Sequence, residues 1–150
     1  KTNIAASAET ECGASVYVSF SADGLYAGTC YYYFAKDQLE RFRHAVAADG
    51  TGGSLEKLVA SARKKGFDVR GQHLKVAPRG FARDHARIGL LRHTGLYVGA
   101  AFPIAEWLHT KSVVTKVNTT LKAAAPVAEW ADAHVGPTTV LPEEWRRATR

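Results

Sequence analysis

The stretch SVYVSFSADGLYAGTCYYYF, residues 15–34, constrains the fold more than any other part of the chain. Apolar and aromatic residues alternate with small or polar ones on both sides of Asp23-Gly24. An Asp-Gly pair in that setting is a strong signal for a two-residue hairpin turn. Centring the turn on this pair predicts two antiparallel strands in which Phe20 faces Ala27.

The same alternation predicts which side chains share a face of the sheet. One face is expected to carry Val16, Val18, Phe20, Ala27, Tyr31 and Tyr33. The other is expected to carry Tyr17, Tyr26, Cys30, Tyr32 and Phe34. Because aromatic residues fall on both faces, we expect the sheet to be covered, at least in part, on both sides.

After the hairpin the pattern changes to a helical period. Asp37 and Glu40 have the spacing of a capping box at the start of a helix within residues 36–50. A loop, TGG, leads to a second helix within residues 54–66, with Ser54 as its cap. Two consecutive helices are therefore expected to follow the hairpin.

The next segment predicts short strands and one more helix. Residues 67–78 are typical of two short strands around Gly71, and Pro78 interrupts the pattern. Asp84 is placed to cap a helix over residues 85–93.

The last part of the chain contributes a strand and then helices. Residues 96–102 predict a strand, and from Pro103 onward the pattern is helical in about three pieces, one of which starts at Pro126. The order of hairpin, helices, strands and helices indicates an α+β fold, with an antiparallel sheet built from hairpins, several packed helices and a helical C-terminal part. We expect a single domain over residues 1–136 and a tail over residues 137–150.

Composition agrees with one folded domain. A chain of 150 residues with 46% hydrophobic and 23% charged residues is long enough and apolar enough to bury a core. It has neither an apolar run of about 18 residues nor a secretory signal pattern, so we expect a cytoplasmic protein with no membrane partner. Because the chain starts at Lys1 and lacks methionine, we also expect it to be the C-terminal part of a longer protein.

The two cysteines are predicted to be free thiols. In the expected register Tyr17 faces Cys30, which leaves Cys12 five residues beyond that partner, or roughly 17 Å along the strand. A disulfide needs Cα atoms within about 7 Å of each other. Two free thiols also suit a reducing compartment.

Positive charge is concentrated in one part of the chain. Residues 63–92 hold nine basic and two acidic residues, a net charge of +7, whereas the whole chain carries +6. Local positive charge of this kind favours an anionic partner.

Within that part, the segment LKVAPRGFARDHA predicts an anion site. Pro78 and Gly80 give the loop a defined shape, and the guanidinium groups of Arg79 and Arg83 can grip a phosphate or carboxylate in two places. The expected ligand is a phosphate-bearing small molecule or a nucleic-acid backbone. The candidate ligand-binding residues are Lys75, Arg79, Arg83, Asp84, His85 and Arg92.

Other interpretations of the same residues stay open. The segment can be a solvated loop whose Asp84 only caps a helix, in a structural or interaction domain without a ligand. It can also belong to a hydrolase or transferase that uses His85 as its acid/base, although adjacent residues such as Asp84 and His85 usually point apart. A further alternative is stacking of nucleic-acid bases on the tyrosines of the hairpin, which we would test at Tyr32.

Several classes of site have no support in the sequence. The six histidines are scattered without the spacing of metal ligands on a helix. There is no phosphate-loop motif, no GxSxG and no dinucleotide fingerprint, so no metal and no cofactor are expected.

Four segments together resemble one bacterial family. GLYAGTCYYYFAKDQLERFRHAVAAD, TGGSLEKLV, LKVAPRGFARDHARIGLLRHTGL and VAEWADAHVG are similar to a conserved-hypothetical group, domain of unknown function 2461. The resemblance spans about residues 15–136, and its most specific element is the Pro-Arg-Gly-aromatic, Asp-His, Leu-Leu-Arg series. It implies a bacterial cytoplasmic protein and supplies no established activity.

The chain departs from the family pattern at two places. Members extend further upstream and carry an Asp-Lys-x-Pro-Tyr-Lys type motif, to which KTNIA corresponds with Lys1 at the first lysine but with Asn3 and Ile4 at the proline and aromatic positions. Ala86 replaces the usual proline after Asp-His, which leaves the start of the following helix less rigidly fixed.

Overall fold

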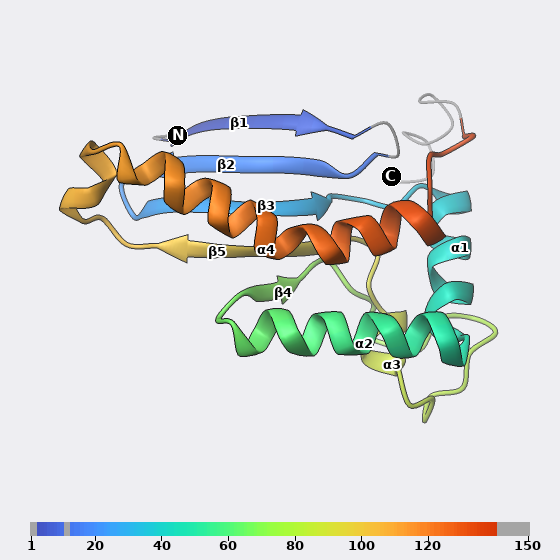
Figure 1. Cartoon of the computed structure of the whole chain (residues 1–150). Coiled ribbons are helices and arrows are strands. Elements are labelled where there is room, and N and C mark those ends of the chain that lie inside the picture. The colour runs from blue at the N-terminus through green and yellow to red at the C-terminus, as the bar shows by residue number, and fades with distance from the viewer. Residues whose placement is uncertain (1–2, 11–12, 141–150) are drawn as a thin grey trace.

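A computed structural model describes residues 3–10 and 13–140 and confirms the α+β fold (Figure 1). The strands of this part of the chain are β1 (Asn3–Glu9), β2 (Ser15–Ser21), β3 (Gly24–Tyr31), β4 (Asp68–Arg70) and β5 (Leu96–Phe102). They form one antiparallel sheet in the order β1-β2-β3-β5-β4. The helices are α1 (Lys36–Ala47), α2 (Asp49–Lys64), α3 (Ile88–Leu91), the 3-10 helix η1 (Glu106–His109) and α4 (Ser112–His134).

The hairpin of β2 and β3 forms as predicted, but its register differs by two residues. Phe20 faces Leu25 rather than Ala27, and the turn residues are Ala22 and Asp23. Gly24 is already the first residue of β3, where its φ of 129° suits glycine and a Cβ atom would lie 2.0 Å from the carbonyl oxygen of Phe102. The glycine therefore serves close packing against β5 rather than the turn itself. A shift of two residues preserves the side-chain alternation, so the predicted faces are correct within β2 and β3. Phe34, predicted on the face of Tyr17, lies beyond the end of β3 and packs in the core beside Tyr31, so that part of the prediction is wrong.

The register also changes the partner of Cys30. Ser15, not Tyr17, faces Cys30, and Cys30 is a free thiol, as predicted. Cys12 lies outside the described residues.

Helices α1 and α2 begin differently from the prediction. The N-cap of α1 is Ala35, whose backbone N–H donates to the side chain of Gln38, so Asp37 and Glu40 do not form the capping box. Helix α2 starts directly after Ala48 and includes the expected TGG loop. Gly52 permits this tight corner, because a Cβ atom there would lie 1.9 Å from the carbonyl oxygen of Val46.

The predicted helix over residues 85–93 is reduced to α3, and Asp84 does not cap it. The backbone N–H of Arg87, the N-cap residue, donates to Nδ1 of His85 at 3.0 Å. The Arg87 side chain is only 12% exposed and pairs with Asp49 and Glu56 of α2. Contacts with α2, rather than a side-chain cap, therefore position the start of α3.

From Pro103 onward the described chain forms the short helix η1 and one long helix, rather than about three pieces. Helix α4 runs for 23 residues and contains Pro126 in its interior. Pro126 removes one backbone hydrogen bond, yet the helix continues because Val127 and Trp130 are buried in the core. No helix of the described residues is long and apolar enough to cross a membrane.

The core lies between the sheet and the helices. Phe34 stacks on Phe42 at 4.7 Å between ring centroids, and Trp130 of α4 meets Phe42 edge-on at 6.2 Å. The indole N–H of Trp130 donates to the carbonyl of Thr51 and the hydroxyl of Ser54. This aromatic cluster joins α4, α1 and α2 on a single side of the sheet.

Candidate ligand site on the open face of the sheet

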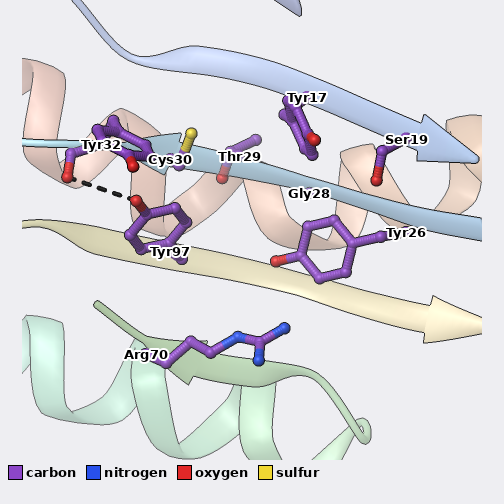
Figure 2. Close-up of a pocket in the computed structure, with 9 residues that line it drawn as sticks. All are labelled: Tyr17, Ser19, Tyr26, Gly28, Thr29, Cys30, Tyr32, Arg70 and Tyr97. Atoms are coloured by element: carbon purple, nitrogen blue, oxygen red, sulfur yellow. Dashed lines mark hydrogen bonds between the residues drawn. The ribbon is translucent and has the colours of Figure 1, made fainter. Parts of the chain in front are cut away.

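The helices cover only one face of the sheet in the described part of the chain. Leu55 of α2, Val127 of α4 and Val98 of β5 belong to the same buried cluster. Figure 2 shows the opposite face, with the helices behind the strands and the labelled side chains in front. The prediction of a sheet covered on both sides is therefore wrong for these residues, and we call this second face the open face.

The open face contains a hollow of about 440 Å³, which we call the tyrosine hollow. It is lined by Tyr17, Ser19, Tyr26, Gly28, Thr29, Cys30, Tyr32, Arg70 and Tyr97 (Figure 2). The alternation of β2 and β3 places Tyr17 and Tyr26 on this face, as predicted. Strands β5 and β4 add Tyr97 and Arg70, which face each other in the register.

Two facing glycines shape the tyrosine hollow, and one of them, Gly28, lines it. Gly28 of β3 and Gly99 of β5 are direct partners in the sheet. A Cβ atom on Gly99 would lie 2.6 Å from the hydroxyl oxygen of Tyr26, so the missing side chain lets the Tyr26 ring lie across the strand. The open face is therefore shallow at this point and surrounded by aromatic rings, instead of being evenly covered by side chains.

The tyrosines form two separate ring pairs. The centroids of Tyr17 and Tyr26 are 6.2 Å apart, and those of Tyr32 and Tyr97 are 5.8 Å apart in an edge-on arrangement. Tyr32 is 69% exposed. Its ring is therefore accessible to solvent at the border of the hollow.

Arg70 supplies the cation of the tyrosine hollow. Its guanidinium carbon lies 5.6 Å from the Tyr26 ring centroid, within cation–π range. The same group pairs with Asp68 at 3.4 Å, and both side chains are more than half exposed, at 61% and 58%. An exposed pair of this kind contributes little stability, so the guanidinium can turn toward another anion.

Two phenols of the hollow, Tyr26 and Tyr97, and its thiol, Cys30, are neutral at ordinary pH. Burial raises the pKa of Tyr97 to about 12, and the neighbouring Tyr32 and Cys30 add to the shift. Burial also raises the pKa of Tyr26, against the opposing effect of Arg70, and it raises the pKa of the Cys30 thiol. The hollow thus offers hydroxyl donors and one cation, which is chemistry suited to binding.

A second hollow of about 550 Å³ adjoins the first. It is lined by Arg70, Gly71, Gln72, His73 and Tyr97, and we call it the polar hollow. The two hollows adjoin at Arg70 and Tyr97, which line both, and we call the two hollows together the groove across β5 and β4. The described residues contain no group of three or more His, Cys, Asp or Glu side chains arranged to hold a metal ion.

The residues predicted to bind an anion lie elsewhere. Four of them, Lys75, Arg79, Arg83 and Asp84, are exposed and make no side-chain hydrogen bond or ion pair with another described residue. Gly80, inside this loop, has a φ of 85°, the left-handed geometry expected of it. None of the six predicted residues lines the groove. A binding role for them stays a prediction.

The other two predicted residues are half-buried. The ring of His85 accepts the backbone N–H of Arg87 through Nδ1, and nothing joins it to Asp84. Arg92 has a buried Nε atom without a hydrogen-bond partner in the described structure. The hypothesis of an enzyme with His85 as acid/base also stays a prediction.

Apart from the tyrosines of the hairpin, the sequence does not indicate the residues of the groove, including its cation, Arg70, and the ring of Tyr97. By sequence, Arg70 is one of nine basic residues in residues 63–92, and Tyr97 is one residue of a predicted strand. The alternation of residues 96–102 could have placed Tyr97 on one face, but the order of strands that brings it beside Tyr26 and Arg70 is a tertiary property.

Comparison with known proteins places the chain in one family. No curated protein and no solved structure matches it. A family model described as "Conserved hypothetical protein (DUF2461)" matches residues 1–130, which cover all five strands and most of α4. The match agrees with the predicted resemblance and begins before the residues on which that resemblance was based. The chain therefore belongs to the DUF2461 family of conserved hypothetical proteins.

Proposed function

We propose that this protein is a binding domain for an anionic ligand and that the ligand occupies the groove on the open face. The observation that carries the proposal is Arg70, an exposed cation placed over the Tyr26 ring at the border of a hollow of about 440 Å³. Ligand sites are typically concave, largely apolar and of a few hundred Å³, with a small number of polar groups that orient the ligand. The tyrosine hollow has this character.

Arg70 is suited to hold the anionic group. A guanidinium binds a phosphate or carboxylate through two parallel hydrogen bonds, and such charge-assisted bonds are stronger than those between neutral groups. The partner that a ligand must displace, Asp68, is itself exposed. The hydroxyl of Tyr26 remains protonated at neutral pH and can donate to the same ligand, whereas the hydroxyl of Tyr97 donates to the carbonyl of Tyr32 at 3.5 Å.

A second candidate anion site is the loop that carries Lys75, Arg79 and Arg83, which we call the basic loop. Lys75, Arg79 and Arg83 are exposed and without ion-pair partners in the described structure, and Gly80 gives the loop a left-handed turn. Their role would be long-range attraction of a phosphate or a nucleic-acid backbone, because they carry charge without lining the groove. A cytoplasmic location is part of the proposal and is supported by the unpaired Cys30 thiol.

A matched pair of variants tests the proposal. Arg70→Ala and Arg79→Ala each remove one exposed arginine, so they change the net charge equally. In calorimetric titrations with inorganic phosphate and pyrophosphate, we expect Arg70→Ala to weaken binding about tenfold or more, because a charge-assisted hydrogen bond is lost. Arg79→Ala is expected to change the affinity less than about twofold, as for a charge that acts only at a distance.

The two variants also define the outcomes against the proposal. Loss of affinity only in Arg79→Ala would move the site to the basic loop. Equal losses in both variants would show an unspecific effect of net charge. Absence of binding to either anion in the unmodified protein would contradict anion binding altogether.

A further inference from the structure

We infer that the ligand of the groove is a nucleotide, with its base on the tyrosines and its phosphate over Arg70 in the polar hollow. This inference rests on the proposed function, since it needs the groove to bind an anion. It adds the chemical class of the ligand. The groove divides into an aromatic part, the tyrosine hollow, and a polar part, the polar hollow.

The tyrosine hollow is suited to a flat ring. Nucleic-acid bases stack on aromatic side chains, and the stacking tolerates different bases because every base has a π-face. The exposed Tyr32 ring meets Tyr97 edge-on, at 72° between ring planes, so Tyr97 does not stack on a face of Tyr32. The Tyr26 hydroxyl occupies the space that a side chain at Gly28 or Gly99 would fill, so the Tyr26 ring lies low across the sheet. The hollow itself, about 440 Å³, is the room available to a planar group.

The border of the same hollow offers hydrogen bonds to a base edge. The Ser19 hydroxyl lies on the open face beside Tyr26, its direct partner in the register. Hydroxyl groups both donate and accept, as the edges of bases require. The raised pKa values of Tyr26 and Tyr97 keep these phenols protonated at neutral pH.

The polar hollow is suited to the sugar and phosphate. It shares Arg70 and Tyr97 with the tyrosine hollow and adds the side chains of Gln72 and His73. A ligand that reaches across both hollows must carry a ring at one end and a polar, anionic group at the other. The shared position of Arg70 places the cation at the junction, within reach of a phosphate attached to a stacked nucleoside.

The nucleotide unit can come from two sources, a free nucleotide or single-stranded nucleic acid. The titration series therefore contains AMP, adenosine, ribose 5-phosphate and a ten-residue single-stranded oligonucleotide. AMP is expected to bind more tightly than either of its parts. An oligonucleotide affinity far above that of AMP, with a steep dependence on salt, would identify nucleic acid as the source, and similar affinities would identify the free nucleotide.

Two variants test the contacts with the base and with the phosphate separately. Tyr32→Ala is expected to weaken AMP and adenosine binding by about fivefold or more, the range seen when one base–aromatic stack is removed, and to leave ribose 5-phosphate unaffected. Arg70→Ala is expected to weaken AMP and ribose 5-phosphate and to leave adenosine unaffected. Phe20→Ala, which removes an exposed aromatic residue from the opposite face, is the control and should change none of the affinities.

The outcomes distinguish this inference from the proposed function. AMP binding no tighter than ribose 5-phosphate, or insensitive to Tyr32→Ala, would overturn the nucleotide assignment. If Arg70→Ala still weakened phosphate binding, the groove would remain an anion site for another ligand class. A lack of binding to every anion tested would overturn both. Because Tyr32 and Arg70 are exposed, circular dichroism is expected to show all three variants folded.

Discussion

At the scale of single residues, the glycines of the sheet matter as much as the aromatic residues they accompany. Gly28 and Gly99 face each other at the centre of the open face, and Tyr26 extends over the space that a side chain at Gly99 would fill. The shape of the tyrosine hollow therefore depends on a side chain that is absent. Nothing in the local sequence of either glycine reveals this pairing.

Replacing Gly99 tests that dependence. In Gly99→Ala the new methyl group would lie 2.5 Å from the carbonyl oxygen of Ala27 and 2.6 Å from the hydroxyl of Tyr26. We expect the unfolding free energy to fall by about 1–3 kcal/mol, the usual effect of overpacking, as measured by urea denaturation. Gly89→Ala is the control, because no atom lies within 4 Å of its Cβ position, and it should leave stability unchanged or raise it by up to about 1 kcal/mol. Equal midpoints for the two variants would contradict the packing argument.

Among the charged residues, the local sequence does not show which side chains form ion pairs. Arg79 and Arg87 both belong to the positively charged residues 63–92, and local charge does not distinguish them. The structure exposes Arg79, whereas Arg87 reaches Asp49 and Glu56 across the chain. Charge density predicted an anionic partner for the whole segment, but only packing tells which cations are already paired.

At the scale of elements, packing overrides local signals for helix ends. Pro126 predicts the start of a helix, yet α4 passes through it because the neighbouring Ala124 and Val127 are buried against the sheet. The core contacts of the flanking residues offset the missing backbone hydrogen bond. The same effect lets α2 begin at Asp49, five residues before its predicted cap, Ser54, where the corner with α1 is tight.

Pro126→Ala is expected to stabilise α4. Pro126 is exposed, so alanine would lose no core contact and would restore a backbone hydrogen bond to the residue four positions earlier. We expect the unfolding free energy to rise by roughly 1–3 kcal/mol, part of the cost of proline inside a helix, less a small gain in unfolded-state freedom. Thermal unfolding followed by circular dichroism measures the effect. A lower melting temperature would mean that Pro126 stabilises the native helix.

At the scale of the whole molecule, one carboxylate ties the C-terminal end of the described chain to α1. Asp37 at the start of α1 accepts hydrogen bonds from the hydroxyl of Thr138 and the backbone N–H of Thr139, and it pairs with Arg41. Arg41 also donates to the carbonyls of Val135 and Pro137. Residues 137–140, expected as the start of a tail, are thereby tied to α1.

The hydrogen bonds and the ion pair of Asp37 predict that the stability of the protein depends on pH. Partial burial alone would raise the pKa of Asp37, but the hydrogen bonds from Thr138, Thr139 and Arg41 hold it well below its usual range. A depressed carboxyl pKa contributes stability above the unfolded-state value of about 4, and this stability is lost as pH falls below it. The difference in unfolding free energy between the unmodified protein and Asp37→Asn should be constant above about pH 5 and shrink as the pH falls below about 4. A difference that does not change with pH would show that the charge of Asp37 is not involved.

The sequence by itself determined the fold class, the hairpin and the division of its residues between two faces. These depend on local periodicity, and alternation survives even a two-residue change of register. The family membership also followed from motifs read along the chain. The concentration of positive charge is also a local property of the sequence. It predicts an anion site in the basic loop and does not indicate the groove.

Only the tertiary structure decided which face of the sheet the helices cover and what lies on the other. The order β1-β2-β3-β5-β4 places Tyr97 and Arg70, far along the chain, beside the tyrosines of the hairpin. Helices α2 and α4 then bury one face and leave the groove open in the described part of the chain. Such contacts join residues about 40 to 80 positions apart in sequence, and their free energy depends on the whole packing arrangement, so no local pattern encodes them.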